Sequence, residues 1–233
     1  MKIVLITNLK KEFDKKLAGV FVREGYKVFS ICDNEIDDVT QLPSDLKEAS
    51  DVLKKNPGLI DIYIDTSDER SLQDNFNVRT GINDQVMRDL YDANVIRPMA
   101  MLEAFYPLLE AGSGKRICYL TSSQASINET QDTNGYGYRM AKAGLHNFLQ
   151  ITRNVLAPKD FTIRVFDPCF PHQPEESVLL NSNDNISSMT AKMAAEAAFN
   201  YFTRGRGVER GDKMRDDENN LVFRDAYGRQ HAW

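Results

Sequence analysis

The residues best suited to chemistry lie in one segment, YGYRMAKAGLHNF, which spans positions 136–148. Tyr138 and Lys142 are four residues apart, so on a helix they share one face. An ammonium group beside a phenol stabilises the phenolate and lowers the pKa of the tyrosine toward working pH. Such a pair can donate a proton to a substrate oxygen or accept one from it. Thr121-Ser122-Ser123 follow an apolar run at 116–120, which adds hydroxyl groups at the end of a predicted strand.

The elements that must position these residues alternate between strands and helices. Short apolar runs predict strands at 2–7, 26–32, 59–64, 116–120, 161–166 and 221–223, and apolar positions at helical spacing predict helices at 12–24, 45–55, 83–111, 135–155 and 189–203. Residues 68–82 are polar and predict a loop or a short helix, and Pro98 predicts a kink in the long helix. This alternation predicts an α/β fold with a mostly parallel, doubly wound sheet in three α/β/α layers. No stretch has the composition of a linker, so we expect one domain over residues 1–233.

Composition excludes several functional classes. The 233 residues are 42% hydrophobic and 27% charged, with a formal net charge of −5, which argues against a general nucleic-acid or anionic-membrane binder. No apolar run approaches the roughly 20 residues of a membrane span. The three cysteines, Cys32, Cys118 and Cys169, form neither a disulfide framework nor a zinc signature, so we expect no metal site. Together with a strand-like run at the very start, they predict a cytoplasmic protein.

At this point the sequence resembles the short-chain dehydrogenase/reductase family over nearly its whole length. YRMAK matches the family's Tyr-x-x-x-Lys motif, ICYLTSS its serine-bearing strand end, and DANVIRPMAMLEAFYPLL its asparagine-bearing helix. The resemblance implies a Rossmann-like sheet of about seven strands and a catalytic tetrad of Asn94, Ser122, Tyr138 and Lys142. Tyr138 would be the acid or base at the substrate oxygen, Ser122 would hydrogen-bond that oxygen, and Lys142 would also hold the nicotinamide ribose. Asn94 would anchor a proton-relay water, and Ser123 is an alternative to Ser122.

The sequence departs from the family where a dinucleotide should bind. In TNLKKEFD, residues 7–14, the three expected glycines are replaced by Asn8, Glu12 and Asp14. Side chains there crowd the backbone approach to a pyrophosphate, and two of them place carboxylates at a helix N-terminus where phosphate should lie. Asp65-Thr66-Ser67-Asp68 replaces the family's Asn-Asn-Ala-Gly. Pro168-Cys169 replaces its Pro-Gly, with Gln173 near the position of its carboxamide-binding threonine.

Other cofactor signals survive. Asp33 ends the second strand, where an acidic group can bond the adenosine ribose and disfavour a 2′-phosphate, so NAD is expected rather than NADP. A solvated acidic turn explains the same residues. Asp45-Leu46 resembles the family's adenine-contacting pair, although a helix N-cap explains Asp45 equally well. The cofactor-binding candidates are therefore Thr7, Asn8, Asp33, Asp45, Leu46, Asp65, Lys142, Pro168 and Gln173.

Two hypotheses follow. The leading one is an NAD-dependent oxidoreductase for a small carbonyl or alcohol, with Tyr138 as acid or base. This hypothesis is compatible with weak or absent binding of the dinucleotide. The alternative is a family member that has lost dinucleotide binding and acts as a regulatory or binding protein. In many relatives the helices corresponding to 83–111 and 135–155 pair between subunits, so the resemblance also implies a homodimer or homotetramer.

Overall fold

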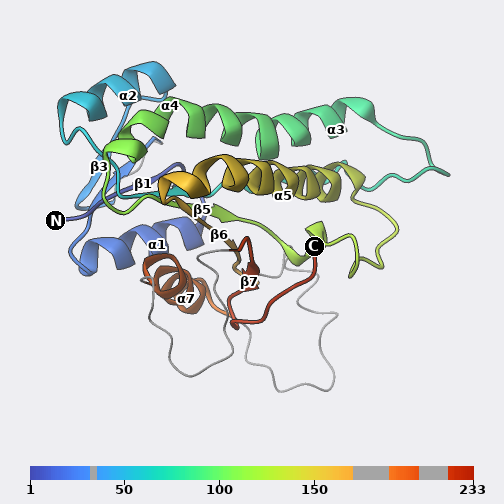
Figure 1. Ribbon diagram of the computed structural model, residues 1–233. Helices are drawn as coiled ribbons and strands as arrows, with labels where there is room; N and C mark the ends of the chain where they lie inside the picture. Colours follow the sequence, from blue (N-terminus) through green and yellow to red (C-terminus); the bar gives the residue numbers. More distant parts are fainter. Residues whose placement is uncertain (32–35, 170–188, 205–219) are drawn as a thin grey trace.

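The computed structural model describes residues 1–31, 36–169, 189–204 and 220–233 (Figure 1). Within them, seven strands form one parallel sheet in the order β3-β2-β1-β4-β5-β6-β7. The strands are β1 (Ile3–Ile6), β2 (Lys27–Ser30), β3 (Val39–Gln41), β4 (Ile62–Asp65), β5 (Arg116–Leu120), β6 (Thr162–Asp167) and β7 (Phe223–Asp225). The strand order reverses between β1 and β4, and open α/β sheets bind ligands at the carboxyl end of such a switch point. The predicted Rossmann-like α/β fold is confirmed.

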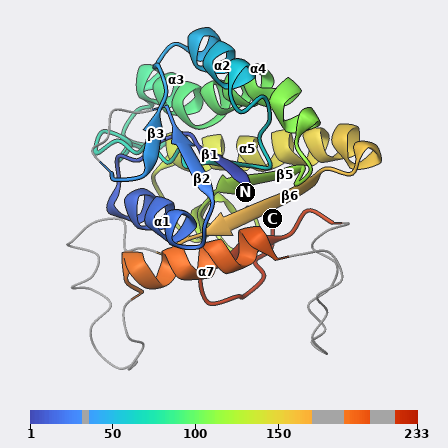
Figure 2. The same cartoon turned by 90° about the vertical axis from the view of Figure 1, so that its left-hand side faces the viewer.

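Helices cover both faces of the sheet. They are α1 (Glu12–Arg23), α2 (Leu46–Lys55), α3 (Asp84–Tyr91), α4 (Arg97–Ala111), α5 (Tyr136–Leu156) and α7 (Ala191–Thr203). Figure 1 shows α2, α4 and α5 on one side of the sheet and α1 and α7 on the other, and Figure 2 shows the same layers turned by 90°. Across the described segments, no helix combines the length and apolar character that crossing a membrane requires.

The hydrophobic core has two halves because successive residues of a strand point to opposite faces. In β1, Ile3 and Leu5 pack in the half that contains α2, α4 and α5. Val4 and Ile6 pack in the half that contains α1 and α7. All four are buried, which is why the strand reads as a continuous apolar run rather than an alternating one.

Several elements differ from the sequence prediction, and the last predicted strand, 221–223, is shifted to Phe223–Asp225. β3 was not expected, because its three residues lie at the sheet edge and are partly or fully exposed, so no apolar run marks it. The predicted strand 59–64 is shifted, and Asp65 is its last residue rather than the first residue of the loop. The long helix changes at a π-helical turn, Asp92–Ile96, which ends two residues before Pro98, rather than at the proline itself. Because the residues before Pro98 are already helical, its missing N–H interrupts the hydrogen-bond ladder next to this turn.

Candidate active site

Tyr138 and Lys142 lie in the first two turns of α5, and a loop carboxylate fixes the start of that helix. Asp74 accepts hydrogen bonds from the backbone N–H groups of Gly137 (2.9 Å) and Tyr138 (2.8 Å), which have no partner within the helix. A Cβ atom at Gly137 would lie 2.8 Å from Leu90 and 3.2 Å from the Asp74 carboxylate. Glycine at this position therefore lets the loop approach closely enough to hold Tyr138 in place.

The hydroxyl group of Tyr138 is engaged on two sides. It donates to Oδ1 of Asp68 at 2.5 Å and accepts from Nη2 of Arg70 at 2.6 Å. The Arg70 guanidinium also lies over the Tyr138 ring, 3.7 Å from the ring centroid. The Nη1 atom of Arg70 donates to the side-chain oxygen of Gln124. The phenol oxygen of Tyr138 thus lies between a carboxylate and a guanidinium that both come from the loop after β4.

Asp68 is the centre of a larger ionic cluster. Its Oδ2 lies 2.9 Å from Nζ of Lys11 and 3.8 Å from Nε of Arg70, and its Oδ1 lies 3.5 Å from Nζ of Lys142. Lys11 also donates to the backbone carbonyl of Asp68. Burial alone would raise the pKa of Asp68, but the three cations and the Tyr138 hydroxyl hold that pKa well below its usual range. Asp68 is therefore a stable carboxylate.

Lys142 does not act on Tyr138 as predicted. The lysine is fully buried, and its Nζ donates to the backbone carbonyl of Ser67 at 2.7 Å, while it lies 5.8 Å from the centroid of the Tyr138 ring. Burial lowers the pKa of Lys142, with Asp68 opposing that shift. The pKa of Tyr138 is raised well above 10, first by burial and then by Asp68, rather than lowered. The expected lowering of this pKa was wrong because burial disfavours the phenolate, and because the Asp68 carboxylate lies at hydrogen-bonding distance from the phenol.

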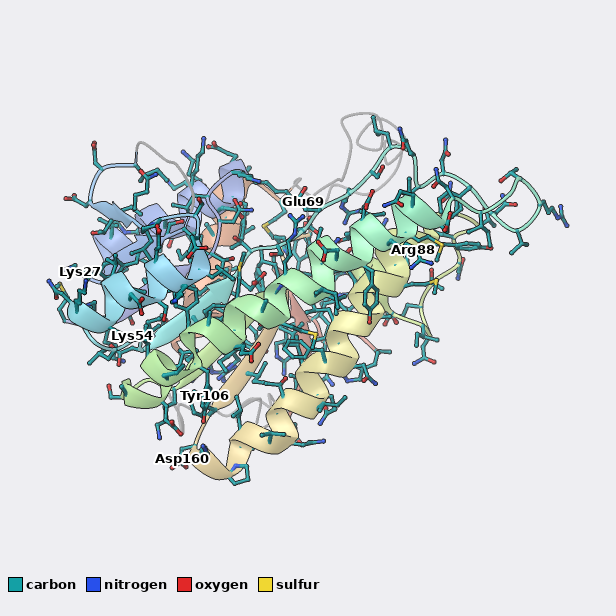
Figure 3. All side chains as sticks on the ribbon, turned by 90° about the horizontal axis from the view of Figure 1, so that it is seen from above. Lys27, Lys54, Glu69, Arg88, Tyr106 and Asp160 are labelled. Atoms are coloured by element: carbon teal, nitrogen blue, oxygen red, sulfur yellow. The ribbon has the colours of Figure 1, made fainter. Side chains whose placement is uncertain are left out.

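Asn94 holds the loop that carries Asp68 and Arg70. It lies in the π-helical turn, is fully buried, and exchanges two hydrogen bonds with the backbone of Glu69: its Nδ2 donates to the carbonyl and its Oδ1 accepts from the N–H. Figure 3 shows Glu69 beside the long helix of which Arg88 and Tyr106 are part. Asn94 is thus placed to fix the loop backbone. Its predicted role toward a relay water stays a prediction.

Ser122 and Ser123 lie where the sequence places them, directly after β5. The Ser122 hydroxyl accepts from the backbone N–H of Gln124 at 3.3 Å and is buried. The backbone N–H of Ser123 donates to Asp167 at the end of β6. These bonds shape the turn, and the contact of either hydroxyl with a substrate oxygen remains a prediction.

The loop after β1 fills the phosphate-binding position with its own side chains. Asn8 accepts from the N–H of Lys10, and Asp14 accepts from the N–H of Lys11 at the start of α1. Burial raises the pKa of Asp14 to about 7, and its Oδ1 is buried without a hydrogen-bond partner in the described part of the chain. A helix N-terminus that already holds a buried carboxylate does not fit a pyrophosphate.

The remaining cofactor candidates have other contacts. The N–H of Thr66 donates to the Thr7 hydroxyl, which joins the loops after β1 and β4. Asp45 caps α2 by accepting from the N–H of Glu48, and Leu46 packs against the core. Asp65 is buried and accepts from the Tyr63 hydroxyl and the Ser67 N–H. Asp33 and Gln173 lie outside the described residues.

A cavity of about 230 Å³ lies beside the ionic cluster. Its lining includes Lys11, Asp14, Asp68, Thr121 and Pro168, so the ends of β5 and β6 and the start of α1 all border it. In the portion of the chain that the structure covers, no group of three His, Cys, Asp or Glu side chains could hold a metal ion. The cavity borders the ionic cluster through Lys11 and Asp68.

Sequence reasoning missed Arg70 and treated Asp68 only as a departure from the family pattern. Both lie in the polar stretch after β4, where no periodicity shows which way a side chain points. The available signal was the replacement of small family residues by charged ones in Asp65–Asp68. Where the family has a small residue that lets a ligand approach the backbone, a charged side chain is a reason to expect that the site differs from the family's.

No protein-family model matches the chain. An uncharacterized oxidoreductase of Schizosaccharomyces pombe is 30% identical over 109 residues, which cover 47% of this chain and 42% of that protein. An uncharacterized oxidoreductase of Saccharomyces cerevisiae is 28% identical over 186 residues, which cover 75% of this chain and 70% of that protein. The matched part therefore spans less than half of the first relative.

Similar solved structures share the fold at low identity. The carbonyl reductase Sniffer of D. melanogaster has a TM-score of 0.77 at 16% identity, covering 100% of both chains. An NADPH-bound carbonyl reductase from chicken fatty liver has a TM-score of 0.76 at 13% identity, again covering 100% of both. A short chain dehydrogenase from Salmonella enterica has a TM-score of 0.69 at 14% identity, covering 86% of this chain and 89% of that one. The resemblance noted in the sequence is thereby confirmed: this chain has the fold of the short-chain dehydrogenases and reductases.

Proposed function

We propose that the chain is an oxidoreductase of the short-chain dehydrogenase/reductase type that reduces a small carbonyl compound, with Tyr138 as the proton donor. The observation that carries this proposal is the position of the Tyr138 hydroxyl, which lies 2.6 Å from the Arg70 guanidinium and is bonded to Asp68, a residue that lines a cavity at the carboxyl edge of the sheet. The two curated relatives, both named oxidoreductases, support the reaction class.

The raised pKa of Tyr138 favours its protonated form. Burial and Asp68 keep the hydroxyl protonated at neutral pH, so it suits a general acid that protonates a developing alkoxide. The Arg70 guanidinium lies next to the same oxygen and can stabilise negative charge there. Lys142 holds the Ser67 carbonyl and thereby the start of the loop. To reach a substrate, the Tyr138 hydroxyl must turn from Asp68 toward the cavity.

NAD is the proposed dinucleotide, and we expect it to bind weakly. A nicotinamide dinucleotide supplies the hydride in such reactions when it is bound. The start of α1 does not fit its pyrophosphate, because Asp14 already caps the helix there. The preference for NAD over NADP is motivated by Asp33 and its acidic neighbours in the sequence.

Calorimetric titration with NAD, NADH and NADPH at one ionic strength tests the cofactor proposal. We expect binding no tighter than about millimolar, with NADH ahead of NADPH. A tighter constant for NADPH would refute the role given to Asp33. No binding at millimolar ligand would favour the second function below.

The second candidate is a binding or regulatory protein that no longer uses a dinucleotide. The specific observation in its favour is the buried Asp14 carboxylate at the N-terminus of α1. A protein of this class would turn over no carbonyl compound with either reduced dinucleotide. The titration and an activity screen therefore separate the two candidates.

We also propose that two copies pair through α4 and α5. An apolar groove between these helices is lined by residues that include Met99, Phe148, Ile151 and Val155. Ile151 is 57% exposed, an unusual setting for isoleucine. Ile151→Asp should convert a dimer to a monomer in analytical ultracentrifugation. Met140→Asp is the matched control, since Met140 is equally exposed on α5 but does not line the groove.

A further inference from the structure

The Asp68 carboxylate lies among four groups on three segments of the chain: it accepts hydrogen bonds from Lys11 and Tyr138 and forms ion pairs with Arg70 and Lys142. Lys11 comes from the start of α1, Arg70 from the loop after β4, and Tyr138 and Lys142 from α5. The shortest contacts are 2.5 Å from the Tyr138 hydroxyl and 2.9 Å from the Lys11 ammonium. Donors of this kind, two ammonium groups, a guanidinium and a phenol, recognise carboxylates through charge-assisted hydrogen bonds.

Asp68 is the anion that balances these cations at closest range. Two other carboxylates lie nearby, but each is held by other donors: Asp65 by the Tyr63 hydroxyl and the Ser67 N–H, and Asp14 by the Lys11 N–H. Lys142 is fully buried, and a buried cation without a counter-charge is strongly disfavoured. Loss of the Asp68 carboxylate would therefore leave Lys142 short of a counter-charge, which an anion at the same position would restore.

The loop backbone on either side of Asp68 is held by contacts that do not involve the Asp68 side chain. Asn94 binds both backbone groups of Glu69, and the Ser67 N–H donates to Asp65, so the residues on either side of Asp68 are held. The Asp68 side chain is 21% exposed. Rotation about its side-chain bonds can carry the carboxylate out to solvent while the loop stays in place.

We propose that this carboxylate is an internal stand-in for the carboxylate of a ligand, and that the substrate is a small carbonyl compound that also bears a carboxylate. When the ligand enters, Asp68 rotates out and the ligand carboxylate takes its contacts with Lys11, Arg70 and Lys142. The exchange releases the Tyr138 hydroxyl, which then donates to the carbonyl oxygen of the same ligand. The substrate class rests on the proposed function, whereas the carboxylate site itself does not.

The test is binding of acetate to Asp68→Ala, which opens the site without adding a charge. Acetate should raise the thermal midpoint of this variant above that in chloride at the same ionic strength. Its affinity for acetate should exceed that of the wild type by about tenfold or more. Acetamide, which has the same shape and no charge, should have no such effect. The control variant is Asp92→Ala, which removes another paired aspartate, 2.8 Å from Arg97, far from the cluster in sequence.

A second change shows which residues bind the acetate. Adding Arg70→Gln or Lys11→Met to Asp68→Ala should abolish the acetate effect, whereas adding Arg88→Gln on the exposed face of α3 should leave it intact. Asp68→Asn keeps the side-chain volume and serves if the alanine variant does not fold, with a smaller acetate effect of the same sign. The proposal is overturned if acetate stabilises the Asp68 variants no more than Asp92→Ala, or if the effect survives loss of Arg70 and Lys11.

These outcomes are independent of the proposed function. Acetate binding without reduction of any carbonyl compound would leave the carboxylate site standing and remove the enzyme assignment. Reduction of neutral carbonyl compounds without acetate binding to Asp68→Ala would do the reverse.

Discussion

The phenol oxygen of Tyr138 lies 2.5 Å from a carboxylate oxygen of Asp68, a residue 70 positions earlier in the chain. This contact has two consequences. It keeps the phenol protonated, because a neighbouring negative charge disfavours the phenolate. The contact also uses the hydroxyl hydrogen of Tyr138 in a bond to Asp68. That bond must break before the hydroxyl can donate to a substrate.

Tyr138→Phe should destabilise the fold. The hydroxyl is buried between Asp68 and Arg70, and its removal leaves both groups short of a partner, which we expect to cost about 1–3 kcal/mol. Chemical denaturation with a linear extrapolation measures this loss. Tyr227→Phe is the matched control, since Tyr227 is 45% exposed, and its effect should stay within about 0.5 kcal/mol. Equal effects of the two changes would show that the Tyr138 hydroxyl is not a buried bonding group.

Asp14→Asn should stabilise the protein at alkaline pH. Burial raises the pKa of Asp14 from 3.8 to about 7, so the folded state holds the proton more tightly than the unfolded chain. Ionising the folded carboxyl therefore costs stability as the pH rises from about 4 to about 7, and above that the cost is complete. Above about pH 7 we expect the free energy of unfolding of Asp14→Asn to exceed that of the wild type by about 2–4 kcal/mol, and at acid pH we expect little difference.

Thermal midpoints of the wild type and Asp14→Asn across this range check the prediction. Glu12→Gln, in the same first turn of α1, removes an exposed charge that is paired with Lys16, so it should show no such pH-dependent gain. A constant difference between wild type and Asp14→Asn at every pH would contradict the assigned pKa.

The C-terminal tail should loosen as the pH rises. His231 lies between Glu129 (2.9 Å) and Asp225 (3.0 Å), with Arg229 bonded to the same aspartate. Burial lowers the pKa of His231, but the two carboxylates raise it more, to above 6.5. The stabilisation by protonated His231 is therefore complete below about pH 6.5. It is lost as the pH rises through the pKa that His231 has in the folded state.

Trp233, the only tryptophan of the chain, reports on this anchoring. Its ring lies 4.8 Å from the ring of His146, whose pKa burial lowers to about 3, so that histidine stays neutral throughout the test. Tryptophan emission should shift to longer wavelength on the alkaline side of the His231 transition. His231→Gln should show the shifted emission at every pH, and an unchanged pH profile in that variant would rule out His231 as the anchor.

The sequence was most informative where residues are buried in a regular pattern. The central strands have both faces covered, so their apolar runs stand out, whereas the edge strand β3 has exposed residues and no such signal. The spacing of Tyr138 and Lys142 correctly predicted a shared helix. It did not reveal that Asp68 and Arg70, from an irregular loop, lie closer to the phenol than Lys142 does. Loop side chains obey no period, so their direction depends on tertiary contacts such as those between Asn94 and Glu69.

The central claim is that Tyr138 is the acid of a carbonyl reductase site, and turnover measures it most directly. Purified wild type and Tyr138→Phe should be assayed with NADH and with NADPH against paired carbonyl substrates with and without a carboxylate. We predict NADH-dependent reduction by the wild type, and a loss of about 10²–10⁴-fold in turnover for Tyr138→Phe at a temperature where both are folded. Undiminished turnover in Tyr138→Phe, or no turnover by the folded wild type with any substrate of the panel, would contradict the claim.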